Sequence, residues 1–196
     1  EDRKTTVEMV KAVARQINIP FTIGGGINSI ADAEVLLQAG ADKISINSAA
    51  IRRPGLIDEL AATFGDQFVV VAVDTRRHGS EQRVYLNGGR ILSEHQTQDW
   101  LFEAQERGAG EILLTSMDQD GTREGFDIPF LKAVNEKLNI PLIASGGAGK
   151  VEDFVAVFLE AGVDAALAAS VFHFGQIAIP ALKSALADAG VPVRLD

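Results

Sequence analysis

Apolar residues along this chain follow two alternating patterns: short continuous runs, and longer stretches in which they recur every three or four positions. Six continuous runs predict buried strands, at residues 20–25, 43–47, 68–74, 111–117, 141–145 and 165–169. Stretches with helical spacing lie at Thr5–Ile17, Ser29–Gln38, Pro54–Phe64, Thr97–Arg107, Ile128–Leu138, Val151–Ala161 and Ile177–Ala189. Such alternation is typical of an α/β fold, in which helices cover a parallel sheet.

Local signals refine this picture. Ser29 is placed to cap the second helix and Gly40 to stop it. One irregular segment, residues 76–93, interrupts the alternation, and within it Arg83–Leu86 followed by Asn87-Gly88-Gly89 predicts a hairpin. Because no linker or low-complexity stretch is visible, we expect a single domain over residues 1–196.

The chain also repeats itself. Ile19–Gly26 is echoed by Ile140–Gly147, and Ala39–Ser48 by Ala161–Ser170, so the repeating unit is a pair of strand–helix modules. At this spacing, the counterparts of the runs at 68–74 and 111–117 would precede residue 1. Six strands and two such counterparts make eight. We therefore expect a (β/α)8 barrel, with six of its eight βα units in these 196 residues, where the fold typically takes roughly 250.

Composition narrows the classes of function. The net charge of −9 would repel phosphate backbones, which argues against a nucleic-acid partner. No apolar run is long enough for a membrane span. The absence of cysteine excludes disulfides and thiolate chemistry and fits a cytoplasmic protein. None of the three histidines has metal-ligand spacing, so we expect neither a metal nor a cofactor.

In a barrel of this kind, chemistry lies at the carboxyl ends of the strands, and here those ends carry small and polar residues. Gly24-Gly25-Gly26 with Asn47-Ser48, and Ser145-Gly146-Gly147 with Ala169-Ser170, occupy equivalent places in the two repeats. Backbone N–H groups of such glycines can approach a phosphate closely, so two sites predict a ligand with a phosphate at each end. The alternative is that the glycines only form tight turns.

Three acidic candidates lie at or near these strand ends. Asp74 ends an apolar strand, where desolvation can raise its pKa and suit it to acid–base catalysis, although it could instead pair with Arg76 or Arg77. The segment Asp118–Thr122 lacks the spacing of a calcium loop and is better read as a turn that hydrogen-bonds substrate or backbone. Lys43 and Glu111 begin their strands at the opposite mouth, where charged residues usually serve stability.

Taken together, these motifs resemble the cyclase subunit of imidazole glycerol phosphate synthase in histidine biosynthesis. The residues that carry the resemblance are Gly24–Ile27, Ala41–Asn47, Val70–Asp74, Arg107–Ser116, Asp120–Thr122, Ala144–Gly149 and Ala168–His173. The glycine runs alone would suit equally well the sister barrel of the same pathway, the phosphoribosyl-formimino isomerase. The last segment favours the cyclase.

The resemblance implies a lyase that takes ammonia from a partner glutaminase subunit. Its substrate is a bis-phosphorylated ribulosyl formimino-aminoimidazole carboxamide ribotide, and its products are imidazole glycerol phosphate and aminoimidazole carboxamide ribotide. By resemblance, Asp74 is one of two catalytic aspartates, and Lys43 and Glu111 belong to a charged gate for ammonia. Also by resemblance, Thr115 contacts the substrate, and one phosphate site comprises Gly26, Asn47 and Ser48. The second phosphate site comprises Asp120, Gly121, Ser145, Gly146, Gly147, Ala169 and Ser170.

The sequence departs from that family at its beginning, because it starts near the end of the loop after the second strand. The first catalytic aspartate is therefore not among these residues. A fragmentary gene product, a piece completed by another chain, and a longer protein given in part are the three explanations. Two function classes follow: a cyclase active once the missing strands are restored, and a non-catalytic remnant that binds bis-phosphates or the glutaminase.

Overall fold

The computed structural model describes residues 2–195, with side chains from residue 7 onward. Its strands are β1 (Thr22–Gly24), β2 (Lys43–Ile46), β3 (Val69–His78), β4 (Glu81–Leu86), β5 (Ile91–Gln96), β6 (Glu111–Ser116), β7 (Leu142–Ser145) and β8 (Ala165–Leu167). Its helices are α1 (Asp2–Ala14), α2 (Ile30–Gln38), α3 (Ser48–Arg52), α4 (Gly55–Phe64), α5 (Thr97–Glu106), α6 (Ile128–Asn135), α7 (Val151–Ala156), α8 (Ser170–His173) and α9 (Ile179–Asp188). Short turns of other helix types are η1 (Asp66–Phe68) and η2 (Val157–Ala161).

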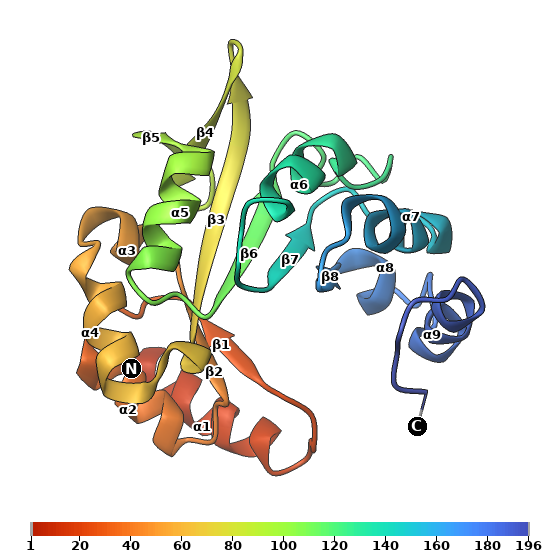
Figure 1. Ribbon diagram of the computed structural model, residues 1–196. Coiled ribbons are helices and arrows are strands. Elements are labelled where there is room, and N and C mark those ends of the chain that lie inside the picture. Colours follow the sequence, from red (N-terminus) through yellow and green to blue (C-terminus); the bar gives the residue numbers. More distant parts are fainter. Residues whose placement is uncertain (1, 196) are drawn as a thin grey trace. The chain divides into compact units, whose positions relative to one another are not determined.

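The six predicted strands are all present and follow one another along the sheet in the order β1-β2-β3-β6-β7-β8. The pairs β1–β2, β2–β3 and β7–β8 are parallel. Helices follow the strands along the chain, as the labelled ribbon shows (Figure 1). The α/β class predicted from the sequence is thus confirmed.

The chain divides into two compact units. The first comprises residues 1–72 and 101–112, and the second comprises residues 73–100 and 113–196. Each unit contains parts of β3 and β6, since the boundary cuts both strands. The single domain expected from the sequence stays a prediction, and the contacts below are described within one unit or the other.

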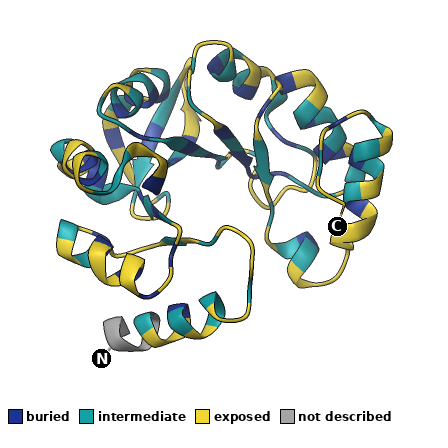
Figure 2. Cartoon of the chain, turned by 60° about the horizontal axis from the view of Figure 1, so that its bottom comes forward, coloured by how far each residue is buried: buried dark blue, intermediate teal, exposed yellow. Residues whose placement is uncertain are grey.

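Alternate residues of the central strands differ in burial. In β6, Ile112, Leu114 and Ser116 are buried whereas Glu111, Leu113 and Thr115 are half-buried. The same alternation occurs in β2, where Ile44 and Ile46 are buried, and in the middle of β3, from Val71 to Thr75. Figure 2 colours these strands mainly dark blue and teal, with yellow concentrated on loops and outer helix turns. One face of each strand therefore packs into a core, and the other remains available to a ligand.

Several element boundaries differ from the predictions. Helix α1 ends at Ala14, three residues before its predicted end, and the predicted helix at 151–161 continues from α7 into a π-helical turn, η2. Strand β3 extends beyond Asp74 to His78 because its end pairs antiparallel with β4. β4 in turn pairs with β5 across the turn at residues 87–90, which confirms the predicted hairpin. The pairing of β4 with the end of β3, which makes this antiparallel extension three-stranded, was not predicted.

The internal repeat is reproduced in atomic detail at the strand starts. The Asp42 carboxylate accepts a hydrogen bond from the Phe21 N–H at 2.8 Å, and the Asp42 N–H donates to the Phe21 carbonyl at 2.9 Å. In the second copy, Asp164 accepts from the Leu142 N–H at 3.0 Å and donates to the Leu142 carbonyl at 3.1 Å. Each aspartate thus fixes the beginning of a strand to its neighbour.

Candidate active site

A pocket of about 290 Å³ lies at the carboxyl ends of β7 and β8, within the second unit. Its lining residues are Asp120, Gly121, Arg123, Ser145, Gly146, Gly147, Ala148, Leu167, Ala168, Ala169 and Ser170. All seven residues expected to form the second phosphate site are among them. The structure therefore brings together residues that three separate loops contribute, and phosphate binding by them stays a prediction.

The glycines of this pocket leave no room for side chains. Gly146 has a φ of 96°, and a Cβ atom there would lie 2.5 Å from the Ser116 carbonyl oxygen. At Gly147 a Cβ would collide with the carbonyl oxygen of Gly125, whose own N–H donates to Gly147 at 2.9 Å. These close approaches are what glycine permits, and they lay the backbone of the β7–α7 loop directly against the β6–α6 loop.

Arg123 lines the same pocket and was not predicted from the sequence. Its φ of 61° is unusual for a residue with a Cβ atom. Its carbonyl group packs so closely against Gly149 that a Cβ on that glycine would collide with it. Arginine gives no turn signal in a sequence, so neither this backbone conformation nor a pocket cation could be recognised there. Leu167, Ala168 and Ala148 also line the pocket and were not predicted.

Asp74 and Thr115 lie on the half-buried faces of two neighbouring strands, β3 and β6. The Met117 N–H donates to the Thr75 carbonyl at 2.8 Å, which sets the register of these strand ends within the second unit. The residues that follow in each strand, Thr75 and Ser116, are buried. Alternation therefore presents the Asp74 carboxylate and the Thr115 hydroxyl on the side away from the core.

Asp118 lies in the β6–α6 loop and contacts the end of β3, the strand that contains Asp74. Its carboxylate accepts a hydrogen bond from the Arg77 N–H at 2.8 Å and lies 3.9 Å from Arg76 Nε. The Arg76 guanidinium lies 5.7 Å from the centre of the Tyr85 ring. The loop thus hydrogen-bonds backbone, one of the two roles expected for it.

The first predicted phosphate site lies in the other unit. Gly26 follows β1, and Asn47 and Ser48 follow β2, so these residues lie at the ends of two neighbouring, parallel strands. Among the described residues, no atom outside Gly26 and its two chain neighbours lies within 4 Å of the position a Cβ would take on Gly26, so its backbone is open to a ligand. The Asn28 side chain donates to the Gly26 carbonyl at 2.9 Å, which orders the loop.

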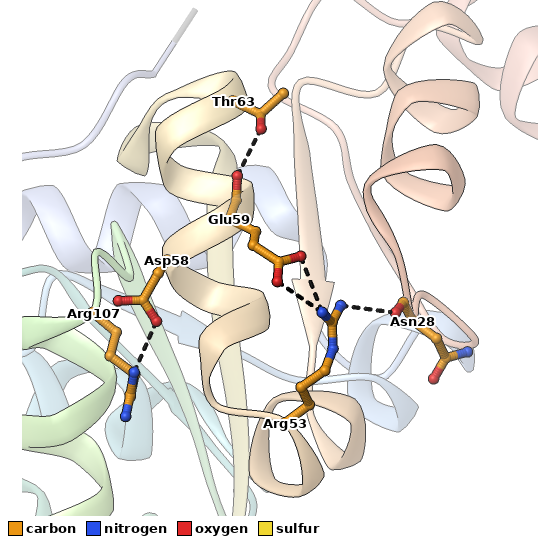
Figure 3. A network of polar contacts seen from close by, with 6 residues as sticks. All are labelled: Asn28, Arg53, Asp58, Glu59, Thr63 and Arg107. Carbon is orange, nitrogen blue, oxygen red and sulfur yellow. Dashed lines mark hydrogen bonds and ion pairs between the residues drawn. The ribbon is translucent and has the colours of Figure 1, made fainter.

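Polar contacts behind this loop are drawn in Figure 3. Arg53 donates to both carboxylate oxygens of Glu59, at 2.8 and 3.1 Å, and more weakly to the Asn28 carbonyl at 3.4 Å. Arg107 donates to Asp58 at 2.9 Å, joining α4 to the end of α5. Hydrogen bonds to Asp58 and then to Glu103 raise the pKa of the Arg107 guanidinium above its ordinary value.

Lys43 and Glu111 form an ion pair. They are the first residues of β2 and β6, which flank β3, so the pair spans the start of that strand. Their side chains are only 26% and 19% exposed, which distinguishes them from freely solvated surface charges. The pair is thus partly shielded from water, and both a role in stability and a role as a gate for ammonia stay predictions.

The described residues contain a second, larger pocket of about 380 Å³, near the start of β1. Among the residues lining it, Asp42 already uses its carboxylate to hold the Phe21 N–H. The described residues hold no group of three or more His, Asp or Glu side chains arranged around a metal position. Nor does any helix in residues 2–195 have the length and apolar character needed to cross a membrane.

Residues 1–178 match the family model of the "Histidine biosynthesis protein". Three similar relatives are each described as imidazole glycerol phosphate synthase subunit HisF. The protein from Bacteroides fragilis is 55% identical over 194 residues, covering 99% of this chain and 78% of the relative. That from Flavobacterium johnsoniae is 55% identical over 195 residues, covering 100% and 78%. That from Bacteroides thetaiotaomicron is 56% identical over 194 residues, covering 99% and 77%.

Proposed function

We infer the function of this chain from the premise that it belongs to the histidine-biosynthesis protein family, among the HisF subunits of imidazole glycerol phosphate synthase. Membership confirms the predicted fold class, the (β/α)8 barrel, of which the sheet holds six strands in sequence. The proposed activity is that of the cyclase subunit, a lyase that closes an imidazole ring. The relatives named above favour this activity over that of the sister isomerase.

The proposed substrate is the bis-phosphorylated ribulosyl formimino-aminoimidazole carboxamide ribotide. The observation that carries the assignment is the convergence of seven predicted phosphate contacts on one pocket. Glycine and alanine backbone there offers N–H groups without side chains in front of them, and Ser145 and Ser170 add hydroxyl groups. Arg123 and Asp120 both line the pocket, and the positive charge of Arg123 attracts a dianion whereas the negative charge of Asp120 repels it.

Gly26, Asn47 and Ser48 hold the substrate's other phosphate in this proposal. The repeat gives the two ends of the substrate equivalent strand-end loops, one in each copy. Thr115 contacts the body of the substrate from the available face of β6.

Asp74 moves a proton during ring closure, as one member of a pair of aspartates. A positioned carboxylate of this kind contributes roughly 10²–10⁴-fold to the rate. The other member belongs to the first strand of the family fold, which is not among these 196 residues. We therefore assign turnover to a protein that contains both carboxylates.

Ammonia reaches the site from a glutaminase subunit that docks at the amino ends of the strands. The Lys43–Glu111 ion pair supports this assignment, since it lies at that end and is partly shielded from water. The cytoplasmic location expected from the absence of cysteine belongs to the same proposal.

Ammonia-dependent turnover of the ribulosyl substrate tests the proposal. The chain is assayed alone and with the N-terminal strands of a HisF relative supplied as a separate polypeptide. Turnover that appears with the added strands supports the cyclase, and turnover by the chain alone contradicts the non-catalytic alternative. Absence of turnover in both, with the complex shown to form, contradicts the cyclase.

The role of Asp74 is tested in whichever preparation is active. Asp74→Asn should lower kcat by about 10²–10⁴-fold with little change in KM, because it removes proton transfer and not a binding contact. Asp164→Asn makes the same chemical change at the start of β8 and serves as the control. Equal kcat values for Asp74→Asn and the wild type would refute the assignment.

A further inference from the structure

Asp153 is the only ionisable side chain among the residues that the structure describes as buried, with 8% of its surface exposed. Burying a carboxylate is unfavourable unless hydrogen bonds replace its hydration. Asp153 occupies the third position of α7 and lines neither pocket described above. Its burial must therefore be offset by hydrogen bonds from neighbouring groups.

The contacts of Asp153 go to the loop that carries the glycines. One carboxylate oxygen, Oδ2, accepts hydrogen bonds from the N–H groups of Gly149 and Lys150, at 2.8 and 3.0 Å. The bond from Lys150 is the half of a capping box that the third helical residue makes. The bond from Gly149 extends one residue further into the loop, toward Gly147.

The other oxygen, Oδ1, faces the second loop of the pocket. It lies 3.5 Å from the position that a Cβ on Gly125 would take. Gly125 itself donates to the Gly147 carbonyl at 2.9 Å. The carboxylate therefore lies behind the pocket, at the place where the β6–α6 and β7–α7 loops are joined.

We propose that Asp153 is a positioning residue for the phosphate pocket: its buried carboxylate holds the β7–α7 loop in the conformation that presents the Gly146 and Gly147 backbone to a phosphate group. The inference rests on the proposed function, since it deepens the assignment of that pocket. Hydrogen bonds to an ionised acceptor are roughly twice as strong as neutral ones, which suits a carboxylate to this task.

The sign of the effect separates positioning from simple electrostatics. A negative charge behind an anion site repels the anion, so removing the charge alone would tighten phosphate binding. Removing the anchor that orders the loop would weaken it. Asp153→Asn removes the charge and keeps the shape of the side chain, so the two explanations predict opposite changes in affinity.

The experiment measures the dissociation constant of inorganic phosphate for the 196-residue chain by calorimetric titration, and follows the Gly146 and Gly147 amide resonances by NMR. We expect Asp153→Asn to weaken binding about tenfold, or about 1.4 kcal/mol, and to reduce the phosphate-induced shifts of both amides. Asp153→Glu keeps the charge and suits the third position of a capping box, so it should recover part of the affinity. This variant keeps the test decisive if Asp153→Asn folds poorly.

Asp164→Asn is the matched control. Asp164 also accepts a hydrogen bond from a backbone N–H, that of Leu142, but at the opposite end of β7 from the pocket. It should lower thermal stability while changing the phosphate dissociation constant less than twofold. Unchanged or tighter phosphate binding by Asp153→Asn, or an equal loss in Asp164→Asn, overturns the inference. A wild-type chain that binds no phosphate instead overturns the assignment of the pocket, and this inference with it.

Discussion

Replacing Gly146 by alanine tests whether steric contact between two loops, beyond backbone strain, requires glycine in the pocket. Gly146 has a φ of 96°, a conformation that costs a residue with a Cβ about 1–2 kcal/mol. The new methyl group would also lie 2.5 Å from the Ser116 carbonyl oxygen and 3.4 Å from the Asp120 nitrogen. That carbonyl cannot easily move away, because it accepts hydrogen bonds from the N–H groups of Gln119 and Asp120 at 3.2 and 2.9 Å.

Gly25→Ala is the matched control, because it carries the strain without the collision. Gly25 has nearly the same φ, 99°, and no atom of the described residues, apart from Gly25 and its two chain neighbours, lies within 4 Å of its Cβ position. It should therefore cost only the backbone term, about 1–2 kcal/mol. Gly146→Ala should cost about 2 kcal/mol more, since overpacking against a fixed backbone group typically costs 1–3 kcal/mol.

The assay is thermal and urea unfolding of both variants, followed by circular dichroism. For a chain of this length, a further 2 kcal/mol corresponds to a Tm about 4–8 °C below that of Gly25→Ala. The urea slope should be unchanged, so that the midpoints report stability. Equal midpoints for the two variants would refute the argument that the β6–α6 loop leaves no room at Gly146.

Three further predictions concern contacts outside the pocket. Asp118→Ala should speed hydrogen exchange of the Arg77 amide about tenfold, because it removes a charge-assisted hydrogen bond, while exchange at Gly25 stays unchanged. The double variant Lys43→Met/Glu111→Gln should be destabilised by about 1 kcal/mol less than the sum of the two single variants, because each single change leaves a half-buried charge without its partner. Strict additivity of the two unfolding free energies would contradict this. The pKa of Arg107 is raised, so the stability that its charge contributes is fully present at any pH below the ordinary pKa of arginine. That stability is lost only in strong alkali. The loss of stability in R107Q should accordingly be the same at pH 7 and pH 10, and a smaller loss at pH 10 would argue against it.

The strands were predictable because their signal is intrinsic to the sequence. A run such as Val69–Val73 is apolar without interruption, and the structure buries nearly all of it. Ser29 was recognisable as a cap for a similar reason, and its hydroxyl accepts from the Asp32 N–H at 3.2 Å. Signals of this kind depend on a few neighbouring residues and need no knowledge of distant contacts.

Features that depend on distant contacts were missed. The extension of β3 beyond Asp74 has no apolar run and is a strand because β4 pairs with it, with Thr75 opposite Val84 and Arg77 opposite Gln82. The short helices α3 and α8 follow strand ends directly and are too short to show periodicity. The residues predicted to bind phosphate were selected through the repeat and the family resemblance, whereas Arg123 and Asp153 take their places from loop packing that no local pattern encodes.

In both copies of the repeat, the start and the end of the strand are held by different kinds of contact. At the start, Asp42 or Asp164 closes a pair of hydrogen bonds with the preceding strand, which fixes the register by side chain and backbone together. At the end, glycines carry no side chain, so the conformation there is set by neighbouring loops and by whatever binds. The repeat therefore accounts for the equivalent places of the two predicted phosphate sites at the carboxyl ends of the strands.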